Sequence, residues 1–240
     1  MIIVASDFDG TLAKEGWPTE ENKEAVAAFR KKGGVFGVVT GRHLCISHQL
    51  PGVVGGLDYL ICSTGAVIID GEGKVLRHVT APLDEMVKDS ILKALTLGCG
   101  YFGVNYLMEQ YAPKMEEGLV VDFGTMTAFD HCNAWFPTEE LADEFVTYIE
   151  TTYPGKWRGY RNGRSVDLPP YGISKVDGIQ WYLSHFGGEE PQIYTVGDNV
   201  NDIPMLEAFP SYAVATGVEK AKAVADHICD TVASMLEELL

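Results

Sequence analysis

The first part of the chain alternates short apolar runs with segments whose apolar residues recur at helical spacing. Residues 2–6 form a run rich in β-branched residues, which predicts a strand buried on both faces. The helix that follows is capped by Thr19 and ends at Gly33-Gly34, and residues 35–40 form the next buried run. A strand, a helix and a second strand in this order predict a βαβ unit with parallel strands.

Later parts of the chain extend the same pattern. Residues 59–62, 193–196 and 213–215 are short apolar runs, so each is predicted to be a further buried strand. Ser174 is placed to cap a helix ahead of the second of these runs, and a closing helix is expected over residues 232–239. The pattern predicts an α/β fold with a Rossmann-like, doubly wound parallel sheet.

The middle of the chain, from residue 83 to residue 170, has a different texture. Helix, strand and strand follow one another twice, and the strands mix aromatic with polar residues. That pattern predicts an antiparallel sheet with helices on one face, which is an α+β arrangement. The predicted elements are a helix from Leu83 to Leu95, strands at residues 101–107 and 118–129, a helix capped by Thr138, and a hairpin that turns at Asn162-Gly163.

The chain is therefore expected to contain a core that is interrupted by an inserted domain. Residues 1–82 and 171–240 are predicted to form the α/β core, and residues 83–170 to form an α+β cap.

Composition narrows the classes of partner. The formal net charge is -16, with 34 acidic and 18 basic residues, so the chain lacks the positive field that general nucleic-acid binding requires. No stretch approaches the roughly 20 apolar residues of a membrane-spanning helix. The amino terminus carries no basic leader, and the five cysteines form no CxxC pair, so we expect a cytoplasmic protein whose cysteines are small buried residues.

Acidic residues follow two of the predicted strands. Asp7 and Asp9 come after the first strand, and Asp198 and Asp202 follow the run at residues 193–196. Because the carboxyl ends of parallel strands share one edge of the sheet, these four side chains should meet there. Their mutual repulsion calls for a cation, and a set of carboxylates without histidine or cysteine favours Mg²⁺.

The same edge of the sheet carries groups that bind anions. Thr40 offers a hydroxyl, Gly10 and Thr11 offer backbone N–H groups, and Lys175 lies in the first turn of its helix. A metal beside an anion site indicates phosphoryl chemistry. Asp7 could then attack phosphorus to form an acyl phosphate, while Asp9 protonates the leaving oxygen and later accepts a proton from water.

In order and spacing, these motifs resemble those of the haloacid dehalogenase-like hydrolase superfamily, and the inserted domain resembles the type-two cap of its Cof-like phosphatase branch. The resemblance implies that Asp7 is the nucleophile and a metal ligand, that Asp9 is the acid/base residue and ligates through its backbone carbonyl, and that Asp198 is the other carboxylate ligand. It also implies that Thr40 and Lys175 bind the phosphoryl group, with Asn201 and Asp202 supporting the metal site or Lys175. The predicted substrate-binding residues are Gly10, Thr11, Thr40, Gly41, Arg42, Lys175 and Asn201, and the predicted metal ligands are Asp7, Asp9, Asp198 and Asp202.

Several residues keep two interpretations. Arg42 either reaches the substrate or pairs with a carboxylate. The six histidines show no helical metal-ligand spacing, so structural or surface roles are the default. Thr64 stands where relatives usually carry asparagine, so it departs from the pattern of the family.

The predicted function is hydrolysis of a small phosphate monoester, most readily a sugar phosphate, by a phosphatase that uses Mg²⁺. A phosphomutase would use the same aspartate pair and remains an alternative, as does a non-catalytic phosphate-binding protein of the same fold. A phospho-accepting receiver domain needs neither the cap nor Asp9, and the length of the chain argues against it. The small phosphorylated metabolite and the oligomeric state are left open.

Overall fold

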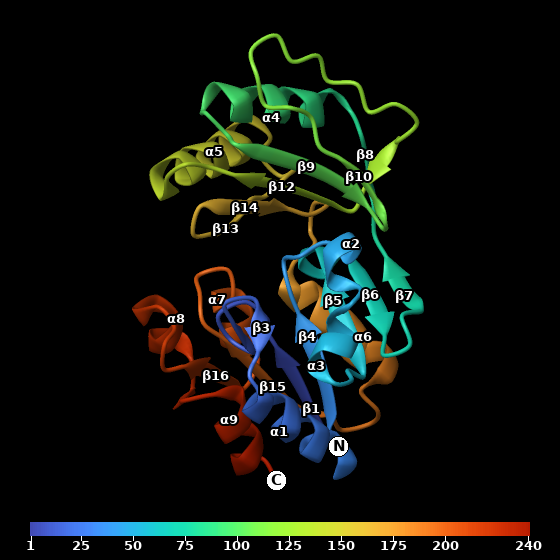
Figure 1. Ribbon diagram of the computed structural model, residues 1–240, viewed down its shortest axis with the longest axis vertical. Coiled ribbons are helices and arrows are strands. Elements are labelled where there is room, and N and C mark those ends of the chain that lie inside the picture. Colours follow the sequence, from blue (N-terminus) through green and yellow to red (C-terminus); the bar gives the residue numbers. More distant parts are fainter.

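The computed structural model describes all residues from 1 to 240. They form two lobes that lie one above the other along the vertical, longest axis of Figure 1. The larger lobe contains an eight-stranded sheet, with the strand order β17-β16-β15-β1-β4-β5-β6-β7. Both chain termini lie at the end of this lobe that is distant from the smaller one (Figure 1). Its strands are β1 (Ile2–Ser6), β4 (Val35–Val39), β5 (Tyr59–Cys62), β6 (Val67–Asp70), β7 (Val75–His78), β15 (Gln192–Gly197), β16 (Ser211–Val214) and β17 (His227–Cys229).

Strand β1 lies in the interior of this sheet because both of its faces are apolar. It pairs in parallel with β15 on one side and with β4 on the other. Val4 packs in the core that includes residues of the first and last helices, whereas Ile3 and Ala5 pack on the opposite side, with residues of the helix that follows Ser174. Helices thus cover both faces, and the predicted α/β fold class is confirmed.

The sheet departs from the predicted parallel arrangement at one edge. Strands β6 and β7 run antiparallel to their neighbours, and β5 is joined to β6 through a short 3-10 turn, η1 (Ser63–Gly65). This edge was not predicted, because a tight connection between β5 and β6 replaces the helix that a parallel crossover requires.

Helices and minor elements complete the larger lobe. Helix α1 begins after Thr19, whose side chain accepts a hydrogen bond from the Asn22 backbone N–H. Helix α6 begins after Ser174, whose side chain accepts a hydrogen bond from the Asp177 backbone N–H. The elements are α1 (Glu20–Lys31), α2 (Leu44–Ser47), α3 (Leu50–Val54), α6 (Lys175–Phe186), α7 (Ile203–Ala208), α8 (Glu219–Val224), α9 (Val232–Glu238) and the two-stranded β2 (Ala13–Lys14) and β3 (Trp17–Pro18).

The smaller lobe, which we call the cap, contains a five-stranded antiparallel sheet in the order β10-β9-β12-β14-β13. Two helices cover the face of this sheet that is turned away from the larger lobe (Figure 1), and side chains from both helices and the sheet form one apolar cluster. The elements are β8 (Ala81–Pro82), α4 (Glu85–Thr96), β9 (Tyr101–Tyr106), β10 (Glu109–Tyr111), β11 (Ala128–Phe129), β12 (His131–Trp135), α5 (Glu139–Thr152), β13 (Tyr160–Asn162) and β14 (Ser165–Leu168).

One predicted cap strand is wrong. Residues 118–129 are mostly irregular, with only Ala128–Phe129 in a short β-pair, and the long strand in this region is β12, at His131–Trp135. The apolar residues of the irregular segment pack on the cap core without strand pairing. Their hydrophobicity therefore reflects tertiary packing rather than a strand period. The boundaries of the cap at residues 83 and 170 stay predictions.

The helices of the structure are all too short or too polar to cross a membrane. The five cysteines are free thiols, and four of them are buried.

Candidate active site

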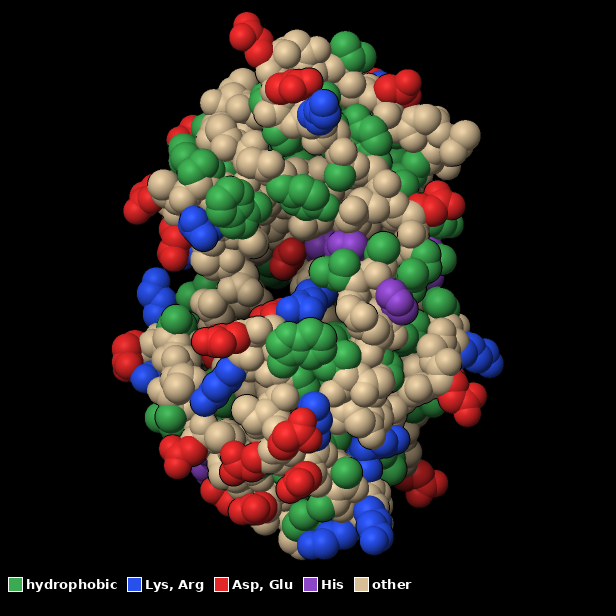
Figure 2. Space-filling model, in the orientation of Figure 1, with side chains coloured by type: hydrophobic (Ala, Val, Ile, Leu, Met, Phe, Trp, Pro, Cys, Tyr) green, Lys and Arg blue, Asp and Glu red, His purple; other side chains and the backbone are tan.

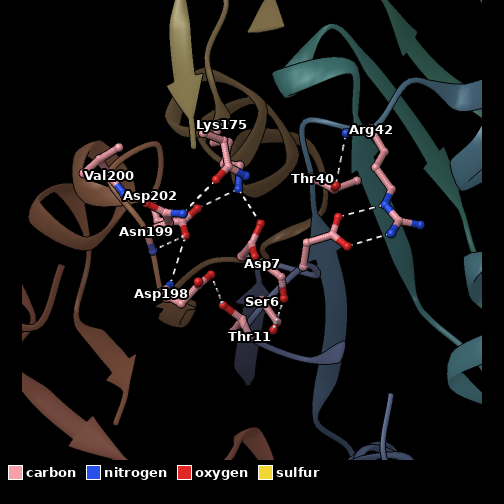
Figure 3. Close-up of polar contacts among 12 residues, drawn as sticks. Ser6, Asp7, Thr11, Thr40, Arg42, Lys175, Asp198, Asn199, Val200 and Asp202 are labelled. Carbon is pink, nitrogen blue, oxygen red and sulfur yellow. Dashed lines mark hydrogen bonds and ion pairs between the residues drawn. The ribbon is translucent and has the colours of Figure 1, made fainter. Parts of the chain in front are cut away.

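Asp7 lies at the carboxyl end of β1, between the two lobes. Its backbone N–H donates to Val196 O at 2.9 Å, which ties the end of β1 to β15. The side chain is 6% exposed, and Lys175 Nζ donates to its Oδ1 at 2.6 Å (Figure 3). The other carboxylate oxygen accepts no hydrogen bond from the chain, so one oxygen of Asp7 is left available for chemistry.

Lys175 is the first residue of α6 and bridges two buried carboxylates. Its Nζ is 2.6 Å from Asp7 Oδ1 and 2.6 Å from Asp202 Oδ1. Asp202 also accepts hydrogen bonds at Oδ2 from the backbone N–H groups of Asp198 and Asn199, at 3.0 and 3.1 Å. Asp202 is thus fully engaged within the protein and holds Lys175 against Asp7 (Figure 3).

Asp198 completes a cluster of carboxylates. One oxygen each of Asp7, Asp198 and Asp202 lies within 4.8 Å of the others. Thr11 Oγ1 donates to Asp198 Oδ1 at 2.9 Å, so the Thr11 hydroxyl supports this carboxylate. Gly10 has a φ of +88°, which side chains rarely allow, and a Cβ there would come within 2.4 Å of Asp198 Oδ2. Both the backbone conformation and the lack of space therefore require glycine at this turn.

The electrostatics of this cluster favour a bound cation. Burial first, and then repulsion by Asp202, raises the pKa of Asp7 well above its usual value. The same two causes raise the pKa of Asp198 to about 6. Burial alone would lower the pKa of Lys175, but the Asp202 and Asp7 carboxylates raise it above its usual value, so this amine is charged. A single ammonium among three carboxylates leaves negative charge that fits a hard divalent ion.

Asp9 lies apart from this cluster and is held by Arg42. The guanidinium donates from Nε to Asp9 Oδ2 at 2.8 Å and from Nη2 to Asp9 Oδ1 at 2.6 Å, and its carbon lies 4.9 Å from the centre of the Phe8 ring. Of the two interpretations of Arg42, the structure shows the carboxylate pair. This two-point contact fixes the direction in which the Asp9 carboxyl group points.

Thr40, Gly41 and Asn201 line the same space. The Thr40 hydroxyl oxygen accepts from the Arg42 backbone N–H at 3.1 Å, which leaves its proton free to donate to an anion. The Asn201 Oδ1 atom is buried and has no hydrogen-bond partner. These residues, with Asp7 and Asp9, form the core side of a cavity of about 190 Å³.

The cap supplies the other side of this cavity. Figure 2 shows the surface hollowed between the lobes, with histidine, acidic and basic side chains gathered around the hollow. Polar residues at alternate positions of β12 and β14 face the cavity, while the residues between them are buried in the cap core. The cavity residues that sequence reasoning did not assign to the site are His43, Ile46, His131, Asn133, Asn162, Ser165 and Asp167.

A signal for part of this set was present in the sequence. His43 directly follows Gly41-Arg42, and Ser165 and Asp167 alternate with apolar residues in the last cap strand. The polar face of such a strand is normally solvent-exposed, so only the position of the cap over the core shows that this face lines a cavity.

Thr64 adopts a backbone conformation that is unfavourable for a β-branched residue. Its φ is +55°, and that of Ser63 is +52°. Asparagine tolerates this left-handed region better than threonine does.

We therefore expect Thr64→Asn to stabilise the protein by on the order of 1 kcal/mol, measured by urea unfolding. Thr64→Val keeps the branched Cβ and removes only the buried hydroxyl, which has no hydrogen-bond partner, so it serves as the control and its smaller gain measures the hydroxyl alone. Equal stabilisation by both variants would show that the hydroxyl, rather than backbone strain, is responsible.

The family profile described as haloacid dehalogenase-like hydrolase matches residues 4–111 and 124–234. The chain belongs to this family. The match includes both aspartate motifs, and the expected membership and the enzyme class, a hydrolase of the phosphatase type, are confirmed.

Similar proteins include the Bacillus subtilis 5-amino-6-(5-phospho-D-ribitylamino)uracil phosphatase YcsE, which is 23% identical over 95% of this chain and 90% of its own. A local match of 64 residues, at 42% identity, relates 26% of this chain to the chloroplastic endoribonuclease YBEY of Arabidopsis thaliana. The chain spans only 11% of that protein, so nothing of its activity is carried over.

Solved structures share the fold over the full length of the chain. A haloacid dehalogenase-like hydrolase from B. subtilis has a TM-score of 0.82 at 20% identity and covers 100% of both chains. A sugar phosphatase of HAD subclass IIB has a TM-score of 0.79 at 21% identity, with 100% of this chain and 99% of that one covered. At these identities the likeness shows the fold alone.

Proposed function

We propose that the chain is a Mg²⁺-dependent phosphatase that hydrolyses a small phosphate monoester through an aspartyl-phosphate intermediate. The observation that carries this proposal is the Asp7 carboxylate, with one oxygen held by Lys175 and the other without a partner, at the floor of a polar cavity. A buried nucleophile of this kind needs a positive neighbour to hold an approaching phosphoryl group, and Lys175 supplies it.

The proposed reaction has two displacements. In the first, an Asp7 oxygen forms a bond to phosphorus, the bond between phosphorus and the ester oxygen breaks, and Asp9 gives its proton to the leaving alcohol. In the second, a water oxygen bonds to phosphorus, Asp9 takes the water proton, and the acyl-phosphate bond breaks to restore the Asp7 carboxylate and release inorganic phosphate. Arg42 holds Asp9 as a carboxylate through both of its oxygens, which suits acceptance of the water proton. One Asp9 oxygen has to leave the guanidinium before Asp9 can carry a proton to the leaving alcohol.

The residues that would hold Mg²⁺ are Asp7, Asp198 and the backbone carbonyl of Asp9, with Asp202 supporting the site. The three clustered carboxylates fit a hard cation by their chemistry and their negative charge. When bound, the ion would neutralise charge on the transferring phosphoryl group.

A sugar phosphate is the substrate class that we favour. Of the 13 residues that line the cavity, only one is hydrophobic, which suits a leaving group rich in hydroxyls. The sugar phosphatase of similar fold and the YcsE phosphatase, named for a ribityl substrate, support this choice.

The test is a panel of phosphate esters incubated with purified protein and Mg²⁺, with release of inorganic phosphate as the readout. We expect turnover that stops in excess EDTA and returns when Mg²⁺ is restored. Isomerised sugar phosphate without release of inorganic phosphate would instead support a phosphomutase. Unchanged activity in EDTA would refute the metal requirement.

Binding of Mg²⁺ should weaken as the pH falls through 6. In the metal-free protein the pKa of Asp198 is raised to about 6, so protons compete for this ligand below that pH. Apparent affinity, measured by calorimetry at pH 5, 6, 7 and 8, should fall by up to about tenfold per unit below 6 for each proton displaced.

The same pKa shift affects the stability of the metal-free protein. The folded state binds the Asp198 proton more tightly than the unfolded chain, so this group favours folding at low pH and becomes unfavourable as pH rises from about 4 to 6.

Affinity for Mg²⁺ that does not change between pH 5 and 8 would contradict the assignment of Asp198 as a metal ligand.

A further inference from the structure

Buried polar atoms that lack hydrogen-bond partners are concentrated at the cavity between the core and the cap. The buried side-chain atoms without a hydrogen-bond partner are His43 Nδ1, Thr64 Oγ1, both ring nitrogens of His131, and Asn201 Oδ1. Three of these four residues line the cavity, and His43 and His131 are only 5% and 1% exposed. Buried polar atoms are normally paired, so their concentration here points to hydrogen bonds that a bound molecule completes.

Asp167 offers an acceptor at the same place. Its carboxylate, 15% exposed, accepts no hydrogen bond from the chain, although His131 Nε2 lies 3.2 Å away in an unsuitable direction. A Cβ on Gly41 would come within 2.3 Å of Asp167 Oδ2, so this cap carboxylate reaches the core beside Thr40. Asp167 lines the same cavity as Asp7, so the part of a substrate that extends beyond the phosphoryl group can reach it.

His43 offers a donor. Gln110, on β10, directs its amide nitrogen both to Asn105 Oδ1 at 2.8 Å and to His43 Nε2 at 3.3 Å. With Nε2 accepting, the ring proton is on Nδ1, the atom that lacks a partner. Burial first, and then the neighbouring His131, lowers the pKa of His43 to about 4, so the ring is neutral near pH 7.

Charge limits what this part of the cavity can hold. Arg42 is the single lysine or arginine among the lining residues, and Asp9 occupies its guanidinium. A second anionic group on the leaving side of the substrate would face Asp167 with no free cation to offset the repulsion. A hydroxyl, which both donates and accepts, matches the histidine rings and the carboxylate.

We propose that Asp167, His131 and His43 form a hydroxyl-binding subsite that selects an uncharged, polyhydroxylated leaving group and disfavours substrates with a second anionic group. The proposal rests on the proposed function, because it takes the phosphoryl group to lie at Asp7. It gives the cap sheet a defined part in recognition, through Asp167 of β14 and His131 of β12.

The first test compares substrates in wild type and Asp167→Asn. The amide keeps the size of the side chain but loses the charge and one acceptor. We expect the ratio of kcat/KM for a hexose 6-phosphate to kcat/KM for p-nitrophenyl phosphate to fall about 10- to 100-fold in the variant. Asp143→Asn, exposed on α5 and outside the cavity, is the matched control and should leave the ratio unchanged.

A second comparison tests the charge. Wild type should use 3-phosphoglycerate, which carries a carboxylate, far less well than the hexose 6-phosphate. Because Asp167→Asn removes the repelling charge, the ratio of kcat/KM for the hexose 6-phosphate to kcat/KM for 3-phosphoglycerate should fall at least tenfold. An unchanged ratio here, together with an unchanged ratio in the first test, would overturn the subsite.

Binding provides a readout that does not need turnover. Calorimetric titrations of Asp7→Asn and of Asp7→Asn/Asp167→Asn with hexose 6-phosphate and with inorganic phosphate give two affinity ratios. The subsite predicts that the sugar phosphate loses at least tenfold more affinity than inorganic phosphate when Asp167 is changed. If wild type hydrolyses no ester, the proposed function fails, and this binding ratio still decides whether the subsite exists; equal losses reject it.

Discussion

Replacement of Asp7 by asparagine is expected to reduce Mg²⁺-dependent release of phosphate by on the order of 10⁴-fold or more. The amide is nearly the same size as the carboxylate, but its oxygen is a far weaker nucleophile toward phosphorus. Lys175 would keep its contact with Asp202, so the fold should survive the change. The measurement is kcat for p-nitrophenyl phosphate at saturating Mg²⁺, with a thermal melt to show that the variant is folded.

Asp9→Asn separates nucleophilic attack from proton transfer. With an aryl phosphate, whose leaving group needs little protonation, the first displacement should be less affected than with an alkyl phosphate. The variant should therefore lose more activity toward the alkyl ester, whereas Asp7→Asn should lose both activities alike. Retention of more than a tenth of wild-type turnover by folded Asp7→Asn would remove Asp7 from the role of nucleophile.

The core of the site was predictable because its residues are fixed by local sequence. Asp7 follows an apolar run, Lys175 follows a capping serine, and Asp198 follows another apolar run, so each position is set by where a strand ends or a helix begins. Parallel topology then brings these ends together. The structure places Lys175 Nζ 2.6 Å from carboxylate oxygens of both Asp7 and Asp202, and one oxygen each of Asp7, Asp198 and Asp202 within 4.8 Å of the others. The expectation that the Asp9 side chain would join this cluster is wrong, because Arg42 holds that carboxylate apart from it.

The cap side of the site could not be predicted for a different physical reason. His131 and Asp167 lie on separate strands, and their meeting with His43 depends on how the cap sheet sits over the core. Nothing local distinguishes a polar strand face that lines a cavity from one in water. The wrong strand at residues 118–129 has a similar origin, because its apolar residues are buried by packing rather than by pairing.

The second large effect is expected from Lys175→Met, which removes the ammonium that offsets two buried carboxylates. Asp7 and Asp202 are 4% and 0% exposed, and the methionine would leave both without their cationic partner. Breaking a buried ion pair on one side typically costs about 3–5 kcal/mol. We expect a loss of this size in urea unfolding of the metal-free protein, together with loss of phosphatase activity.

The pH dependence of that loss shows whether charge is its cause. Burial raises the pKa of Asp7, and protonation of this carboxylate removes part of the uncompensated charge, so the destabilisation by Lys175→Met should be largest at pH 8 and clearly smaller at pH 5. Lys175→Met/Asp202→Asn should recover part of the stability at pH 8 without recovering activity. Lys93→Met, which breaks a looser pair with Glu144 on the cap surface, is the control and should cost less than about 1 kcal/mol. A loss that is equal at both pH values would attribute the effect to packing of the lysine stem, and the charge balance around Asp7 would then need another source.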